Sequence, residues 1–289
     1  MSAAIYSVIE KKGFHDGIVF IVTQDNCSIE VHVYSGVIIW AKSPRLSLDQ
    51  ICETLAQVDL KEISFRESIE SPDIVQAPLL ARTFPAVAAS AINPAATSPA
   101  TLIKIVRLMP GLIKSDKDQG AHTFEVMRRE IANRHAGFLS DVVTIKKRMF
   151  ELDEKFGMGS LALEYKAMPD DLTAMPEWIF RHLDSIKDST MKDSILYFLF
   201  FGRMPAKVIR LKIEQATSLG AKHGRGILSK IVYPGLQDRG SASLFRGADK
   251  IGDLKIDWDK DEKEPIVMTK ADLDHLGLRK DDKINIILE

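Results

Sequence analysis

The chain is poor in cysteine, with only Cys27 and Cys52 among its 289 residues. The two lie apart, without a CxxC spacing or a neighbouring histidine cluster. Neither a disulfide framework nor a zinc site is therefore indicated. We expect both cysteines to be small buried residues, because a free cysteine packs like an apolar side chain.

Long hydrophobic runs are also missing, since no stretch reaches the roughly 18 apolar residues that a membrane-spanning helix needs. The first residues, "MSAAIYSVIEKKG", show neither a basic leader followed by an apolar stretch nor a cleavage pattern. Hydrophobic residues still make up 45% of the chain, which is enough for real cores and argues against wholesale disorder. The sequence predicts a cytoplasmic protein without membrane insertion.

Recognisable catalytic and metal motifs are lacking as well. The seven histidines are scattered, with no HExxH spacing, and no GxSxG nucleophile elbow occurs. Residues 257–262, "DWDKDE", resemble the start of an EF-hand calcium loop, but Glu262 stands at the glycine position and Met268 at the final glutamate position. A solvated acidic turn is expected instead. We assign no catalytic residue, metal or cofactor, and the chain is predicted not to be an enzyme.

What the N-terminal region does have is the pattern of strands. "GIVFIVTQ", from Gly17, and "SIEVHVY", from Ser28, alternate with a period of two residues. A third run, "VIIWA", follows across Ser35 and Gly36, a pair suited to a tight hairpin. A helix with the capping pattern Ser47 to Gln50 and a further strand, "KEISFRES", complete a small antiparallel sheet with a helix.

These residues resemble the PatA amino-terminal (PATAN) family of bacterial regulatory domains. The likeness lies in "GFHDGIVFIVTQDNCSIEVHVYSGVIIWAKS", the amphipathic helix after it, and "EISFRES" with its closing aromatic Phe65. The hairpin signature is the segment from Ser35 to Ala41, and the resemblance covers residues 1 to about 70. It implies docking to other proteins in bacterial regulation, in signalling or surface motility. Family members often also carry a phosphoacceptor receiver domain, which we do not find in this sequence.

A linker is predicted for residues 72–100. This stretch is rich in alanine and is interrupted by Pro78, Pro85, Pro94 and Pro99. Repeated proline forbids one continuous helix, so we place a domain boundary here.

A helical domain is predicted for residues 101–220. Its first helix is expected to begin at the N-cap Ser98 and to stop at Pro110 and Gly111. Residues 195–204, "ILYFLFFGRM", are apolar nearly all round, which indicates a central core helix or, as the alternative, an interface with a partner. Further helical segments are expected at 122–156, 172–186, 190–202 and 205–219.

The remaining residues, 221–289, are predicted to be a basic glycine-rich segment and a small α/β tail. "GAKHGRGILSK", from Gly220, lacks the Gly-Lys-Ser/Thr order of a phosphate loop, so a flexible connector is expected. The tail predicts a strand, a short helix capped by Thr269 and ended by Gly277, and a last strand from Lys283 to Leu288. Because this last strand is so apolar, we expect it to pair with other strands in a sheet. The predicted fold class is thus α+β.

The net charge of −1 conceals one basic segment, because residues 203–250 contain ten Lys and Arg against three Asp and Glu. A local positive field attracts anions even when the whole chain is nearly neutral. These side chains are candidates for binding phosphates or an acidic partner, and a solvated basic face is the alternative. The candidates are Lys207, Arg210, Lys212, Lys222, Arg225, Lys230, Arg239 and Arg246.

Three classes of function follow. The first is a non-enzymatic bacterial regulatory or scaffolding protein that docks other proteins, with Trp40 as a candidate residue of the interaction surface. A core position for Trp40, covering the helix from Leu48 onward, is the favoured alternative, since Trp is usually largely buried. The second is a nucleic-acid-binding transcriptional regulator that uses the basic segment 203–250. The third is an enzyme with a constellation that sequence motifs do not reveal.

Overall fold

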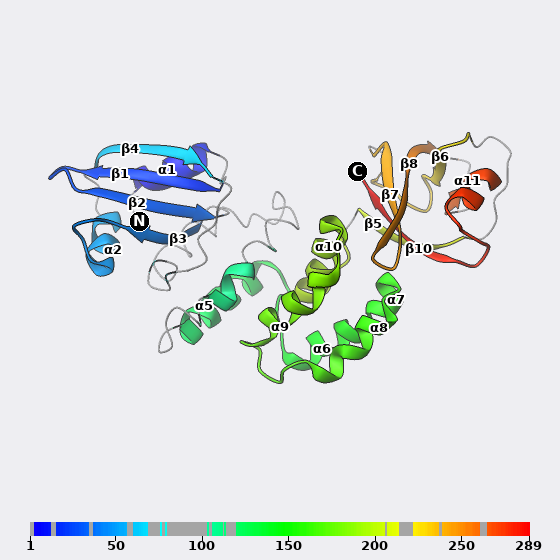
Figure 1. The fold of residues 1–289 in the computed structure, drawn as a ribbon, viewed down its shortest axis with the longest axis horizontal. Helices are drawn as coiled ribbons and strands as arrows, with labels where there is room; N and C mark the ends of the chain where they lie inside the picture. Colours follow the sequence, from blue (N-terminus) through cyan, green and yellow to red (C-terminus); the bar gives the residue numbers. More distant parts are fainter. Residues whose placement is uncertain are drawn as a thin grey trace. The chain divides into compact units, whose positions relative to one another are not determined.

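The computed structural model describes most of the chain. The described residues are 3–12, 16–34, 37–56, 60–68, 76, 79, 103, 106–111, 113, 120–205, 207–213, 222–236, 239–260 and 265–289. They form an N-terminal unit, residues 1–140 and 169–179, and a C-terminal unit, residues 141–168 and 180–289. The fold class is α+β, as predicted (Figure 1). The predicted domain boundaries near residues 71, 100 and 220 fall outside the described residues and stay predictions.

The N-terminal unit contains an antiparallel sheet with the strand order β3-β2-β1-β4. The strands are β1 (Gly17–Thr23), β2 (Ser28–Tyr34), β3 (Val37–Lys42) and β4 (Leu60–Glu67). The predicted strands are confirmed, because burial alternates along them as a half-covered sheet requires. The predicted turn at Ser35 and Gly36 lies outside the described residues.

Two helices cover one face of this sheet. Helix α2 (Leu48–Ala56) begins as predicted: the Ser47 N–H donates to Gln50 Oε1 at 2.9 Å, and the Gln50 N–H donates to Ser47 Oγ at 3.4 Å. Helix α1 (Ala3–Lys11) was not predicted, although Ile5 and Ile9 stand one helical turn apart. Both isoleucines are buried with the inward side chains of the sheet.

The linker predicted at 72–100 is described only at Gln76 and Leu79. The Gln76 N–H donates to the Ile39 carbonyl at 2.8 Å, and Gln76 Oε1 accepts from the Ala41 N–H at 2.8 Å. Gln76 thereby satisfies backbone groups along the edge strand β3. Leu79 is buried in the core of the N-terminal sheet.

The single helical face predicted over residues 122–156 is divided among three separate helices, α5 (Gly120–Arg134), α6 (Val142–Phe150) and α7 (Leu152–Phe156). Helix α5 ends before Gly137 and Leu139, whose φ angles are 90° and 36° and therefore left-handed. The helix predicted to stop at Pro110 and Gly111 includes both residues, whereas its predicted N-cap lies outside the described residues.

The C-terminal unit begins with short helices. These are α6 (Val142–Phe150), α7 (Leu152–Phe156), α8 (Gly159–Ala162), the 3₁₀ turns η1 (Leu163–Ala167) and η2 (Leu183–Ser185), and α10 (Ser189–Phe201), while α9 (Met175–His182) spans the division between units. The predicted helices near 172–186 and 190–202 are confirmed. Helix α10 is also the predicted core helix, since its apolar side chains from Ile195 to Phe201 are largely buried.

The second sheet of the chain has the strand order β5-β10-β7-β8-β6-β9. The strands are β5 (Val208–Lys212), β6 (Arg225–Ser229), β7 (Ser241–Arg246), β8 (Asp249–Asp259), β9 (Ile266–Val267) and β10 (Lys283–Leu288). Neighbours pair antiparallel except β6 and β8, which are parallel. The final strand finds its sheet by inserting between β5 and β7.

Two predictions in this region are wrong. Residues 208–212 form strand β5 rather than part of a helix over 205–219, because β10 supplies a partner strand; residues 214–219 lie outside the described residues. The described part of the predicted connector "GAKHGRGILSK" is not flexible, since Arg225–Ser229 form strand β6. Pairing with strands distant in the sequence outweighs the weak strand propensity of this glycine-rich sequence.

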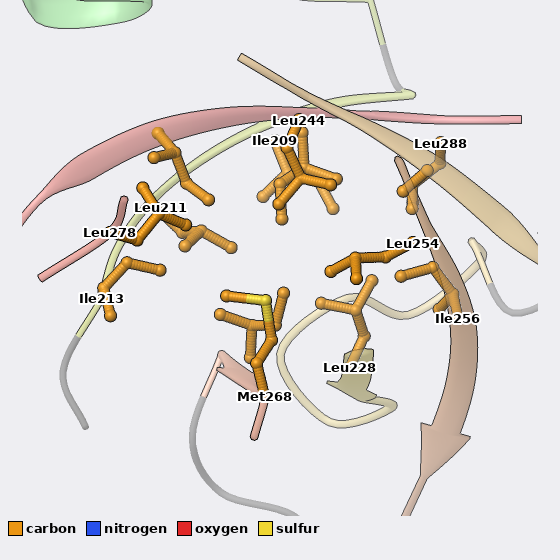
Figure 2. Packing of buried hydrophobic residues seen from close by; sticks show 14 of the residues in the cluster. Ile209, Leu211, Ile213, Leu228, Leu244, Leu254, Ile256, Met268, Leu278 and Leu288 are labelled. Atoms are coloured by element: carbon orange, nitrogen blue, oxygen red, sulfur yellow. The ribbon is translucent and has the colours of Figure 1, made fainter. Parts of the chain in front are cut away.

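The strands of the C-terminal sheet curl around one apolar core. Figure 2 shows Ile209, Leu228, Leu244, Leu254 and Met268 pointing toward a common interior from different strands and the chain after β9. The predicted short helix is confirmed as α11 (Lys270–His275): Thr269 Oγ1 accepts from the Asp272 N–H at 3.1 Å. The turn after α11 contains Gly277, whose φ is 62°.

Among the described residues, no helix is both long and apolar enough to cross a membrane.

Candidate functional site

The N-terminal sheet has one covered face and one face that the described helices leave open. We call the second the outer face. Strand register places its residues side by side, with Trp40 opposite His32 and Lys42 opposite Glu30. Phe20 lies opposite Glu30 on β2 and Ser64 on β4. The outer face consists of Ile18, Phe20, Val22, Ser28, Glu30, His32, Tyr34, Trp40, Lys42, Glu62, Ser64 and Arg66.

Trp40 lies on this outer face and is half-buried. Its ring meets the His32 ring edge to face, with centroids 4.7 Å apart, and Lys42 Nζ lies 5.2 Å from the indole centre. Both are favourable aromatic contacts, one with a neighbouring ring and one with a cation. The indole is therefore held in place on the open side of the sheet and does not belong to the core against α2.

Glu30 orders the polar part of the outer face. Its carboxylate lies 2.7 Å from His32 Nε2 and 3.2 Å from Lys42 Nζ. Burial alone would raise the pKa of Glu30, but the hydrogen bonds with His32 and Lys42 outweigh it and the pKa lies below its ordinary value. Glu30 is thus ionised at neutral pH and fixes two neighbours of Trp40.

A largely apolar groove of about 600 Å³ opens beside these residues. Phe20 and Val22 from β1 line it, together with Lys42 and Pro44 at the end of β3. The Arg66 guanidinium stands 5.4 Å from the centre of the Phe20 ring. The groove therefore has apolar walls and a rim of both charges.

The eight basic candidates do not gather into one patch. Arg225 Nη1 pairs with Asp257 Oδ1 at 2.6 Å, and Arg246 Nη2 donates to the Gly277 carbonyl at 2.8 Å. Lys207 precedes β5, Lys222 precedes β6, Lys230 follows β6 and Arg239 precedes β7. Arg210 and Lys212, on the same side of β5, line one cleft together.

That cleft, which we call the basic cleft, has a volume of about 350 Å³. Helix α7 contributes Lys155, and strand β10 contributes Lys283. Neither lysine was a sequence candidate, because both lie outside the basic segment and carry no local motif. The full lining is Glu154, Lys155, Met204, Val208, Arg210, Leu211, Lys212 and Lys283.

A buried amide holds Arg210 at the floor of the basic cleft. Arg210 Nη1 donates to Asn285 Oδ1 at 3.1 Å, and Asn285 Nδ2 donates to the carbonyls of Phe156 at 2.8 Å and Gly247 at 2.9 Å. Asn285 is 0% exposed. It ties β10 to the end of α7 and to the β7–β8 turn. Burial lowers the pKa of Arg210, and the Asp153 carboxylate opposes that shift.

The described residues contain no group of three or more His, Cys, Asp and Glu side chains that could hold a metal ion. Of the EF-hand-like segment, Asp257 and Asp259 lie in β8, and residues 261 and 262 lie outside the described residues. Both cysteines are buried, as expected, and neither forms a disulfide.

Comparisons of the chain with protein-family models, with curated proteins and with solved structures found no match.

Proposed function

We propose that the protein is a non-enzymatic regulatory or scaffolding protein of the bacterial cytoplasm, which docks a partner protein on the outer face of its N-terminal sheet. The observation that carries the proposal is the groove lined by Phe20, Val22 and Lys42, with Trp40 outside that lining but on the same face of the sheet. The PATAN resemblance of the same residues supports it, because that resemblance implies docking in signalling or surface motility.

The chemistry of the outer face suits a protein partner. Protein interfaces combine an apolar centre, often aromatic, with a polar rim. Phe20 and Val22 supply apolar walls here, while Glu30, Lys42 and Arg66 supply rim charges of both signs. We infer that the partner inserts an apolar side chain into the groove and pairs polar groups with the rim.

The edge strand β3 is a less suitable docking place than the outer face. Gln76 already bonds the Ile39 carbonyl and the Ala41 N–H. A partner strand that added to β3 would have to displace both hydrogen bonds. Recognition through side chains on the outer face leaves them intact.

Affinity capture with the full chain as bait tests this proposal. A partner is first identified with the unaltered protein, then purified and titrated against Phe20→Ser, Trp40→Ala and a control, Val143→Ser. Val143 is an exposed aliphatic residue on α6, 76% exposed. We expect Phe20→Ser, which removes an aromatic wall of the groove, to weaken binding at least about 30-fold, as loss of a central anchor does. Trp40→Ala should weaken binding less, because Trp40 lies on the same face outside the groove lining, and the control should bind as the unaltered chain.

The proposal fails if no protein is captured specifically, or if the purified partner binds all three variants equally.

A further inference from the structure

After the groove on the outer face, the basic cleft is a second place whose lining residues suit a ligand. Four of its side chains are cationic, Lys155, Arg210, Lys212 and Lys283, against the single carboxylate of Glu154. Met204 and Val208 form an apolar part of the wall, whereas the Leu211 side chain belongs to the core on the other face of β5. The cleft thus combines an excess of positive charge with a less polar surface.

The acidic partners of the cleft lysines are weakly held. Lys155 Nζ lies 3.0 Å from Glu154 Oε1, and Lys212 Nζ lies 2.7 Å from Asp281 Oδ1. All four side chains are well exposed. Exposed pairs of this kind contribute little to stability, so an anion can replace either carboxylate at small cost. For Lys283, the described residues offer no acidic group within ion-pair distance.

Arg210 differs from the lysines because it is prearranged. Its guanidinium is fixed in one orientation, because it donates a hydrogen bond to Asn285 Oδ1 and packs against the backbone of Gly157. Its bonded partner Asn285 is a neutral amide, so the nearest hydrogen bond carries no opposing charge, and among the described residues the Asp153 carboxylate acts on Arg210 only through space. A fixed, half-buried guanidinium is well suited to the planar recognition of a phosphate.

We propose that the basic cleft binds a phosphorylated small molecule of nucleotide size, with its phosphates among Lys155, Arg210, Lys212 and Lys283 and its less polar part against Met204 and Val208. The volume of about 350 Å³ falls within the range of small-molecule sites, roughly 300–1,000 Å³. The site is separate from the outer face and independent of the docking function.

A nucleic acid fits these observations less well. Binding along a phosphate backbone requires cations spread along a continuous track. Outside the basic cleft, however, Arg225 is paired with Asp257, and Arg246 is bonded to the Gly277 carbonyl. The cations that converge do so on one compact cleft.

Isothermal titration of the full chain at low salt tests the proposal, with inorganic phosphate, pyrophosphate, ATP and a single-stranded DNA oligonucleotide as probes. We expect pyrophosphate and ATP to bind, and ATP to bind more tightly because of the apolar wall. Lys155→Ala and Lys283→Ala should each weaken both about tenfold, the effect of losing one charge-assisted contact. The control is Lys255→Ala, an exposed lysine on β8, which should bind like the unaltered chain.

Three results overturn the proposal. One is the absence of binding to pyrophosphate and ATP, and another is equal weakening by all three lysine variants. The third is binding of the oligonucleotide alone, which would favour a nucleic-acid regulator instead.

Discussion

The two sheets of this protein differ in how their strands find partners. In the N-terminal unit, β1 pairs with β2 and β2 with β3, which are neighbours in the chain, and β1 also pairs with the more distant β4. In the C-terminal unit, β10 pairs with β5, and the bonded residues Arg210 and Asn285 on these strands are 75 positions apart. The N-terminal sheet packs one face against helices and leaves the other open, whereas the C-terminal sheet curls around its own core.

This difference decides where each unit can present a functional surface. The open sheet offers side chains of its strands directly, and Phe20 and Trp40 stand on that face. The curled sheet turns its apolar side chains inward, so its candidate site lies where β5 and β10 meet α7. Three changes test this comparison, from the largest expected effect to the smallest.

Replacing Asn285 tests whether the C-terminal unit depends on one buried polar junction. Asn285→Leu removes the donor for the Phe156 and Gly247 carbonyls and the acceptor for Arg210. We expect the free energy of unfolding to fall by about 4 kcal/mol, because buried polar groups lose their partners. Urea unfolding followed by the fluorescence of Trp258, with Trp40 and Trp178 replaced by Phe, reports on this unit.

The control for that experiment is Lys283→Ala, an exposed change on the same strand, which should alter the free energy of unfolding by less than about 0.5 kcal/mol. Equal losses in the two variants would show that Asn285 is not a special junction.

Adjacent residues on β1 test the two faces of the N-terminal sheet. Ile21 is 1% exposed and points into the core, whereas Val22 is half-buried and points to the outer face. We expect Ile21→Ala to cost about 3 kcal/mol of unfolding free energy, and Val22→Ala less than about 1 kcal/mol. A chain in which Trp40 is the sole tryptophan reports the transition. A reversed order would mean that the outer face is covered in solution.

Glu125 provides the smallest predicted effect, through pH. Hydrogen bonds from Arg128 are the main cause that lowers the pKa of Glu125 from 4.5 to about 2. A lowered pKa in the folded state means that the ionised carboxylate stabilises the fold above pH 4.5, and that this stability is lost as the pH falls from 4.5 toward 2. The gain is small because Glu125 is part-exposed.

Thermal unfolding between pH 7 and pH 2.5 measures this contribution. In Glu125→Gln the melting temperature should fall less steeply with acid than in the unaltered chain, while Glu53→Gln, a change at an exposed residue on α2, should leave the slope unchanged. The same slope in all three proteins would show that ionised Glu125 does not stabilise the fold.

Sequence reasoning predicted the N-terminal sheet well because its signals are local. The alternation in β1 and β2 and the reciprocal cap of Ser47 and Gln50 are visible within short windows. It failed at β5, because Val208, Ile209 and Leu211 fit a helical stripe as readily as a short strand. The strand identity comes from β10, which no local pattern reveals.

The candidate sites follow the same division. Trp40 was singled out from a short strand pattern, and the structure places it on the outer face. Arg210 and Lys212 were singled out from the charge of their segment, but Lys155 and Lys283 come from distant parts of the chain. Their convergence depends on the packing of α7 against the sheet, so the sequence offered no signal for it.

The most direct test of the central claim is photo-crosslinking of the partner to the full chain, with a benzophenone amino acid placed at position 20 or, as a control, at position 143. The account predicts a covalent adduct with the partner from position 20 on the outer face and none from position 143. Adducts of equal yield from both positions, or from position 143 alone, would contradict it.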